Sequence, residues 1–139
     1  MNIALTALVL NALWTVALGG SVVAWRFTLA RARVFAPNAF PSGTAHGPER
    51  YWRLNRAHIN AAENLSIFAV AILAGRVAGV DGPVFAVLAV VALLARVTQS
   101  TVHVASNRNR AVLVRAAAFF TQLVCLALML VQVTWKILG

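Results

Sequence analysis

Three side chains that could bind a small charged molecule lie on one stripe of an apolar segment. Arg56, Asn60 and Glu63 are spaced at i, i+4 and i+7, which places them on the same face of a helix. A guanidinium binds carboxylates through paired hydrogen bonds, and a carboxylate can hold an ammonium group. A charged side chain at the centre of a bilayer costs about 2.5 kcal/mol or more, whereas a polar contact between membrane helices contributes only about 0.6 kcal/mol. This difference favours a binding function for the stripe over a role as a contact between helices.

The next apolar segment carries a second polar stripe. Its polar residues follow the spacing i, i+3, i+4 and i+7: Arg96, Gln99, Ser100 and His103. Arg110 follows His103 by seven residues, at the start of the last apolar segment. Both stripes lie nearest the same membrane face, so they indicate one site between helices. Because this site is rich in arginine, we expect its ligand to be anionic, with Glu63 available to an ammonium group.

Four apolar segments must position these residues. They cover about residues 3–25, 57–80, 84–103 and 111–138, and each is long enough to cross about 30 Å of hydrocarbon. The 139 residues are 61% hydrophobic and 11% charged, against about 25% charged in soluble domains. We therefore expect an all-α integral membrane protein, a single four-helix bundle over residues 1–139. The first segment lacks a basic leader and is followed by Arg26, so we expect a retained helix rather than a cleaved signal peptide.

The basic residues, which give the chain a net charge of +9, gather in two of the connections. The connection 26–56 and the one around "ASNRNR" are rich in arginine, whereas the short "AGVDGP" is not. Positively charged connections stay in the cytoplasm, so we expect both basic connections and the site to face that side. Basic residues set between apolar segments do not favour nucleic-acid binding. The histidines and the single Cys125 match no metal site, and a lone cysteine excludes an intramolecular disulfide.

The two polar stripes resemble motifs of a known family. "RAHINAAEN" (residues 56–64) and "ARVTQSTVHVASNRNRA" (95–111) are similar to the MAPEG family, the membrane-associated proteins in eicosanoid and glutathione metabolism. The first motif looks closest to the microsomal glutathione transferase type, and "ARVFAPN" (32–38) resembles the basic loop of that group. The resemblance extends over nearly the whole chain. It implies a four-helix membrane fold, a homotrimer and binding sites between neighbouring subunits.

The resemblance also implies a role for each residue of the site. It makes glutathione the co-substrate, with contacts from Arg31, Arg56, His58, Asn60, Glu63, Arg96, Gln99 and His103. Arg110 matches the arginine that activates the thiol. The pKa of a free thiol is about 8.5, and a neighbouring arginine favours the nucleophilic thiolate. The implied activity is that of a glutathione transferase, or a peroxidase, acting on lipophilic electrophiles that arrive through the lipid.

The sequence departs from the family pattern at several points, among them the Glu49-Arg50 pair, which lies further upstream of the first motif than is usual. His103 stands where a tyrosine is usual, and Ser66 stands where a proline is expected. These departures concern the substrate class more than the fold. One alternative is a non-catalytic MAPEG-like protein that binds lipids or partner proteins. Another is a small proton-coupled exporter with Glu63 as its carrier carboxylate, although arginines along the path would repel a cationic cargo.

Overall fold

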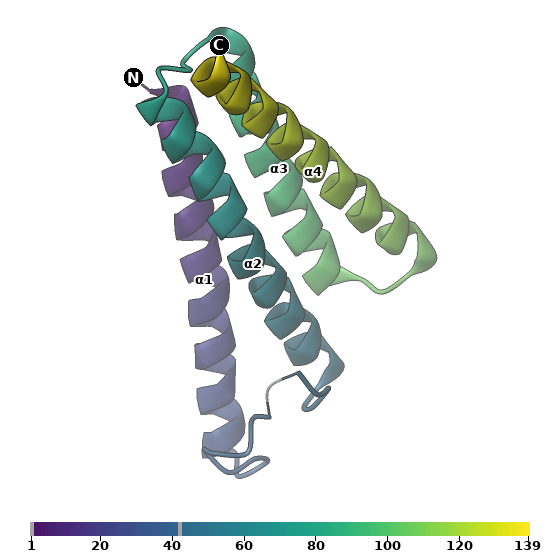
Figure 1. The fold of residues 1–139 in the computed structure, drawn as a ribbon. Coiled ribbons are helices and arrows are strands. Elements are labelled where there is room, and N and C mark those ends of the chain that lie inside the picture. The colour runs from purple at the N-terminus through teal and green to yellow at the C-terminus, as the bar shows by residue number, and fades with distance from the viewer. Residues whose placement is uncertain (1, 42) are drawn as a thin grey trace.

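Four long helices make up the computed structural model, which describes residues 2–41 and 43–139 (Figure 1). The helices are α1 (Ile3–Arg31), α2 (Glu49–Val77), α3 (Pro83–Ala105) and α4 (Asn109–Leu138). All four are long and apolar enough to cross a membrane, so the described residues fit a multi-pass integral membrane protein. The predicted bounds of the last two helices, 84–103 and 111–138, agree with the structure to within two residues.

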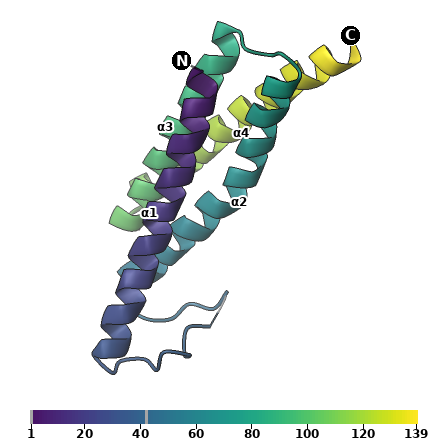
Figure 2. The same cartoon turned by 90° about the vertical axis from the view of Figure 1, so that its left-hand side faces the viewer.

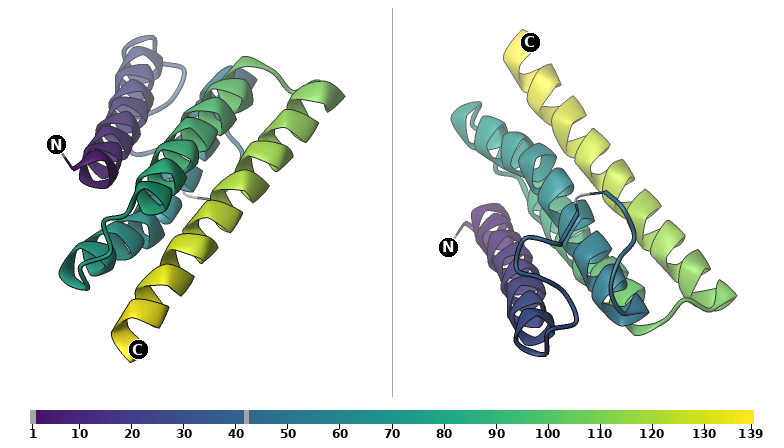
Figure 3. Two further views of the ribbon diagram at one scale, coloured as in Figure 1. Left: turned by 90° about the horizontal axis from the view of Figure 1, so that it is seen from above. Right: turned by 90° about the horizontal axis from the view of Figure 1, so that it is seen from below.

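Successive helices run in opposite directions, so the connections alternate between the two ends of the bundle. The beginning of α1, the turn between α2 and α3 and the end of α4 lie at one end (Figures 1 and 2). The connection between α1 and α2 lies at the other end. Seen along the bundle, α1 and α4 are on opposite sides, with α2 and α3 between them (Figure 3). Within the described chain, α1 packs against α2 and α3 but not against α4.

The first helix is longer than predicted. The sequence predicts a helix over residues 3–25, but α1 continues to Arg31. Apolar content marks only the part of a helix that lies in hydrocarbon, and helical hydrogen bonding continues into the interface, where arginine side chains reach water. The helix ends where Arg33 adopts a φ of +56° and the Val34 N–H donates to the Leu29 carbonyl at 3.0 Å. This is a left-handed backbone termination of the kind that often closes helices.

The second helix begins earlier than predicted. A helix over residues 57–80 is expected, but α2 covers Glu49–Val77 and follows Pro48, whose backbone is extended. Proline is compatible with a helix start because the first helical turn leaves its N–H groups without intrahelical partners. The basic connection is therefore 32–48 rather than 26–56. The second half of the predicted connection, with Arg50, Arg53 and Arg56, is the first part of α2, so these side chains have helical positions.

The connection between α1 and α2 is packed against the start of α2. The buried Tyr51 hydroxyl accepts a hydrogen bond from Arg26 Nε at 3.0 Å and lies 3.2 Å from His46 Nε2. Because a carbonyl oxygen only accepts, His46 Nδ1 donates to the Thr44 carbonyl at 2.8 Å. The Arg26 guanidinium also lies over the Phe40 ring, 5.3 Å from its centroid. These contacts hold the connection and the two helix ends together.

Close packing joins α2 to α3 next to their short turn. Gly75 is buried, and a Cβ atom at this position would lie 2.5 Å from Cζ of Phe85. The Phe85 ring is buried too, so it cannot move aside without losing its own contacts. Small residues allow membrane helices to approach closely. Gly75 provides the space that the Phe85 ring occupies.

We expect Gly75→Ala to lower the melting temperature of the detergent-solubilised protein. The added methyl group overpacks a buried contact, which typically costs about 1–3 kcal/mol. Gly20→Ala is the matched control, because a Cβ at Gly20 on α1 would meet no atom within 4 Å. Thermal unfolding followed by tryptophan fluorescence compares the two variants. Equal melting temperatures would contradict the packing role of Gly75.

Candidate functional site

A groove between α2, α3 and α4 brings part of the predicted site together. Its volume is about 410 Å³. The polar residues that line it are Asn60, Glu63, Asn64 and Gln99. The apolar residues that line it are Ile67, Phe119 and Leu123. Three residues that the sequence predicts to act together, from two separate helices, therefore border one cavity: Asn60, Glu63 and Gln99.

Gln99 is held in place by the buried Arg96 on the same helix. Arg96 Nη1 donates a hydrogen bond to Gln99 Oε1 at 2.6 Å, and the residue Arg96 is only 1% exposed. With its oxygen engaged in this way, Gln99 has its amide N–H groups left for the groove. Arg96 does not itself line the groove, although the Glu63 carboxylate is close enough to interact with its charge. Within this chain Arg96 contributes to the groove indirectly, through its hydrogen bond to Gln99.

Several buried polar atoms around this site have no hydrogen-bond partner among the described residues. They are Nε and Nη2 of Arg96, Oδ1 of Asn64, and both amide atoms of Gln122 on α4. A buried polar atom that stays unpaired costs about 1–3 kcal/mol. These atoms therefore mark a region with free capacity to bind water or a polar ligand. Asn64 and Gln122 are not among the predicted site residues, although Asn64 directly follows Glu63 in the sequence.

Basic side chains gather around His103, where α2, α3 and α4 approach the end of the bundle that carries the basic connections. The charges of Arg53, Arg56 and Arg115 all act on the half-buried His103 ring. Arg53 also links α2 to α3, because its Nε donates a hydrogen bond to the Val104 carbonyl at 3.3 Å. This concentration of positive charge suits an anionic ligand. The structure thus places the predicted Arg56 and His103 in one basic cluster.

Arg115 is a member of this cluster that the predicted site does not include. It is half-buried on α4, four residues before Phe119 and seven before Gln122. This spacing puts Arg115 on the same helix face as a groove residue and a buried amide. The i, i+4, i+7 pattern that identifies the stripe on α2 is therefore present on α4 too.

His58 lies on a different face of α2 from the groove. The ring packs against α1, where a Cβ atom at Gly19 would come within 2.8 Å of His58 Nε2. His58 is two residues from Asn60, and residues two apart on a helix do not face the same neighbour. Within this chain the His58 ring therefore contacts α1, while Asn60 borders the groove.

Arg110 and Arg31 stay outside the groove of a single chain. Arg110 is the second residue of α4 and is exposed. It precedes Phe119 by nine residues, or about 13 Å along a helix axis. The beginning of α4 also diverges from α1 and α2 (Figure 1). Arg31 is exposed at the end of α1, a helix that does not contact α4.

A comparison of the sequence with known families agrees with this architecture. The sequence profile of the MAPEG family matches residues 4–135, which include most of every helix. No curated protein matches the chain closely enough to count as a relative. The family match extends through nearly the whole sequence and all four membrane-length helices, and the chain therefore belongs to the MAPEG family.

Proposed function

We propose that this protein is a glutathione-dependent transferase or peroxidase that ionises the glutathione thiol for attack on lipophilic electrophiles. The observation that carries the proposal is the groove in which Asn60, Glu63 and Gln99 meet. Its volume of about 410 Å³ is within the range of about 300–1,000 Å³ that small-molecule sites occupy. Membership of the MAPEG family, which includes glutathione transferases, supports the same assignment.

The charges around the groove complement those of glutathione, which has two carboxylates, one amine and one thiol. The exposed Glu63 carboxylate is suited to the amine. Arg56 and Arg115 belong to the basic cluster around His103, and their guanidinium groups are suited to the carboxylates. Arg53 of the same cluster already pairs with the Glu49 carboxylate. The amide N–H groups of Gln99 can donate to a further carboxylate or carbonyl oxygen. The ligand thus receives partners of opposite charge at both ends.

The proposed catalytic residue is Arg110, whose guanidinium would stabilise the thiolate. Because Arg110 and Arg31 lie outside the groove of one chain, a site that includes both requires a second copy of the chain, since movement of α4 would carry Arg110 but not Arg31. A homotrimer with sites between subunits would meet this requirement. The many apolar side chains exposed on the isolated chain are available to such neighbours and to lipid.

The two reactants would reach the site by different routes. The arginine-rich end of the bundle would face the cytoplasm, and glutathione would enter from there. Ile67, Phe119 and Leu123 give the groove an apolar side, which is suited to an electrophile that arrives through the lipid. No metal is needed for this chemistry, because the cationic side chains supply the positive charge.

The first test measures the glutathione thiolate by ultraviolet difference absorbance during titration of the detergent-solubilised protein. We expect a saturable thiolate band with the unmodified protein and its loss in Arg110→Ala. Without the guanidinium, the pKa of the bound thiol should return toward about 8.5, and each pKa unit corresponds to a tenfold change in the thiolate-to-thiol ratio. Arg108→Ala is the matched control, since it removes another exposed arginine from the same end of α4.

Calorimetric binding of glutathione completes this test. Binding without a thiolate band in the unmodified protein would favour a non-catalytic family member. No binding at all would refute the proposed function. An equal loss of the band in Arg108→Ala and Arg110→Ala would mean that overall positive charge, rather than Arg110, ionises the thiol.

Gln99→Glu separates the structural role of Gln99 from its binding role. The new carboxylate keeps an acceptor for Arg96, so the melting temperature should be unchanged or higher. It also replaces the amide donor by a negative charge at the groove, so glutathione affinity should fall by about tenfold or more. Gln99→Leu should instead lower both stability and affinity. Undiminished affinity in Gln99→Glu would remove Gln99 from the site.

Glu63 can be tested with a glutathione analogue that lacks the amino group. We expect the unmodified protein to bind this analogue about tenfold more weakly than glutathione, because the contact between carboxylate and ammonium is lost. Glu63→Gln should bind both ligands with similar, weak affinity. If Glu63→Gln still discriminates between the two ligands, another group recognises the amine.

A further inference from the structure

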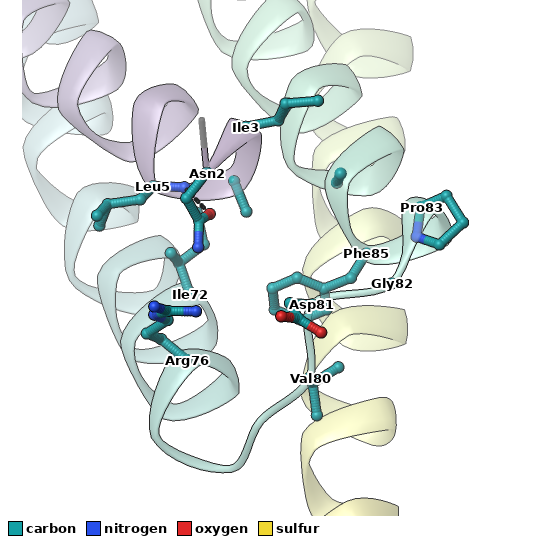
Figure 4. Close-up of a pocket in the computed structure, with 12 residues that line it drawn as sticks. Asn2, Ile3, Leu5, Ile72, Arg76, Val80, Asp81, Gly82, Pro83 and Phe85 are labelled. Carbon is teal, nitrogen blue, oxygen red and sulfur yellow. Dashed lines mark hydrogen bonds between the residues drawn. The ribbon is translucent and has the colours of Figure 1, made fainter.

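A second cavity lies at the opposite end of the bundle from the basic cluster. Its volume is about 520 Å³, and it is formed by the beginning of α1, the end of α2, the α2–α3 turn and the beginning of α3 (Figure 4). Arg76 from α2 and Asp81 from the turn lie on opposite sides of it. Ala4, Ile72 and Phe85 are the buried apolar residues of its lining. The cavity thus combines one cation, one anion and an apolar floor.

The two charged side chains of this cavity have no ion-pair partner among the described residues. Arg76 and Asp81 are both exposed and form no ion pair with each other or with another described residue. Lys136 borders a neighbouring hollow that also includes Asp81, but it does not pair with this carboxylate either. Opposite charges that remain separate across one hollow suit a ligand that itself carries a separated anion and cation.

The position of the cavity indicates where such a ligand would come from. The four helices are of membrane length, so their ends lie near the interface between hydrocarbon and lipid head groups. Arg76 and Asp81 are at that level, next to the exposed apolar side chains Ile3 and Leu5 of α1. A membrane phospholipid has a charged head group next to apolar chains, which matches the charged residues of the cavity and the apolar surface beside them. A soluble zwitterion would leave the neighbouring apolar surface uncovered.

We propose that this cavity binds a zwitterionic phospholipid whose head group carries a primary ammonium. Its phosphate would pair with Arg76, its ammonium would donate hydrogen bonds to Asp81, and an acyl chain would lie along Ile3 and Leu5. A primary ammonium has N–H donors for the carboxylate, whereas a choline head group has none. A head group without a cation would bring a negative phosphate near Asp81 and would offer that carboxylate no ammonium partner. This site is separate from the proposed glutathione groove and does not depend on it.

Native mass spectrometry of the detergent-solubilised full-length protein tests the proposal. The probes are phosphatidylethanolamine, phosphatidylcholine and phosphatidylglycerol at equal concentration. We expect about tenfold stronger binding of phosphatidylethanolamine, and about a tenfold loss of it in Arg76→Gln and in Asp81→Asn, since each change removes one charged hydrogen bond. Arg33→Gln, at the other end of the bundle, makes the same change in charge as Arg76→Gln and should bind normally.

Four results would overturn the proposal. Equal binding of the three lipids would mean that Arg76 and Asp81 do not recognise the head group. Normal lipid binding in both cavity variants would mean the same. Dissociation of an oligomer in either variant would mean that Arg76 and Asp81 join copies of the chain. Soluble glycerophosphoethanolamine that binds as tightly as the lipid would identify a soluble ligand instead. The melting temperature of each variant shows whether it is folded. If only one of the two is folded, the lipid binding of that variant alone tests the proposal.

Discussion

Hydrocarbon offers no hydrogen-bond partner to a peptide group, and this constraint governs the whole molecule. Every backbone group within a bilayer must be paired inside the protein, so residues 2–41 and 43–139 form four helices that continue without interruption for 23 to 30 residues. Chemistry in the membrane must then come from side chains that recur on one helix face. The polar stripes on α2, α3 and α4 have this helical spacing because the backbone within the bilayer must remain helical.

A buried guanidinium adds a second requirement to the packing of α2, α3 and α4. Arg96 is almost completely enclosed, yet only one of its three nitrogen atoms has a hydrogen-bond partner among the described residues. A buried charge is tolerated only where nearby groups compensate it. The Gln99 oxygen and the Glu63 charge supply part of this compensation. The structural need of Arg96 and the polar character of the groove are therefore two aspects of one arrangement.

The number, order and approximate position of the helices follow from the apolar segments, because hydropathy reports contact with lipid. The exact ends of α1 and α2 do not, because Pro48 and the left-handed Arg33 determine them outside the apolar region. Helical spacing places Asn60 and Glu63 on one face of a helix, and the position of both polar stripes near the same membrane face predicts Gln99 in the same site. Spacing cannot show that His58 packs against α1, or that α4 carries Arg110 away from the groove, since both depend on how the helices are placed relative to one another.

The early start of α2 determines at which depth the groove lies. Twenty-nine residues extend for about 43 Å, whereas the hydrocarbon layer is about 30 Å thick, so part of the helix lies beyond it. Arg50, Arg53 and Arg56 mark the end that extends into water. Asn60 and Glu63 follow within two turns, near the boundary of the two phases rather than at mid-membrane. A groove at this depth borders both phases, so a water-soluble ligand and a lipid-dissolved one can each reach it from the phase that dissolves it.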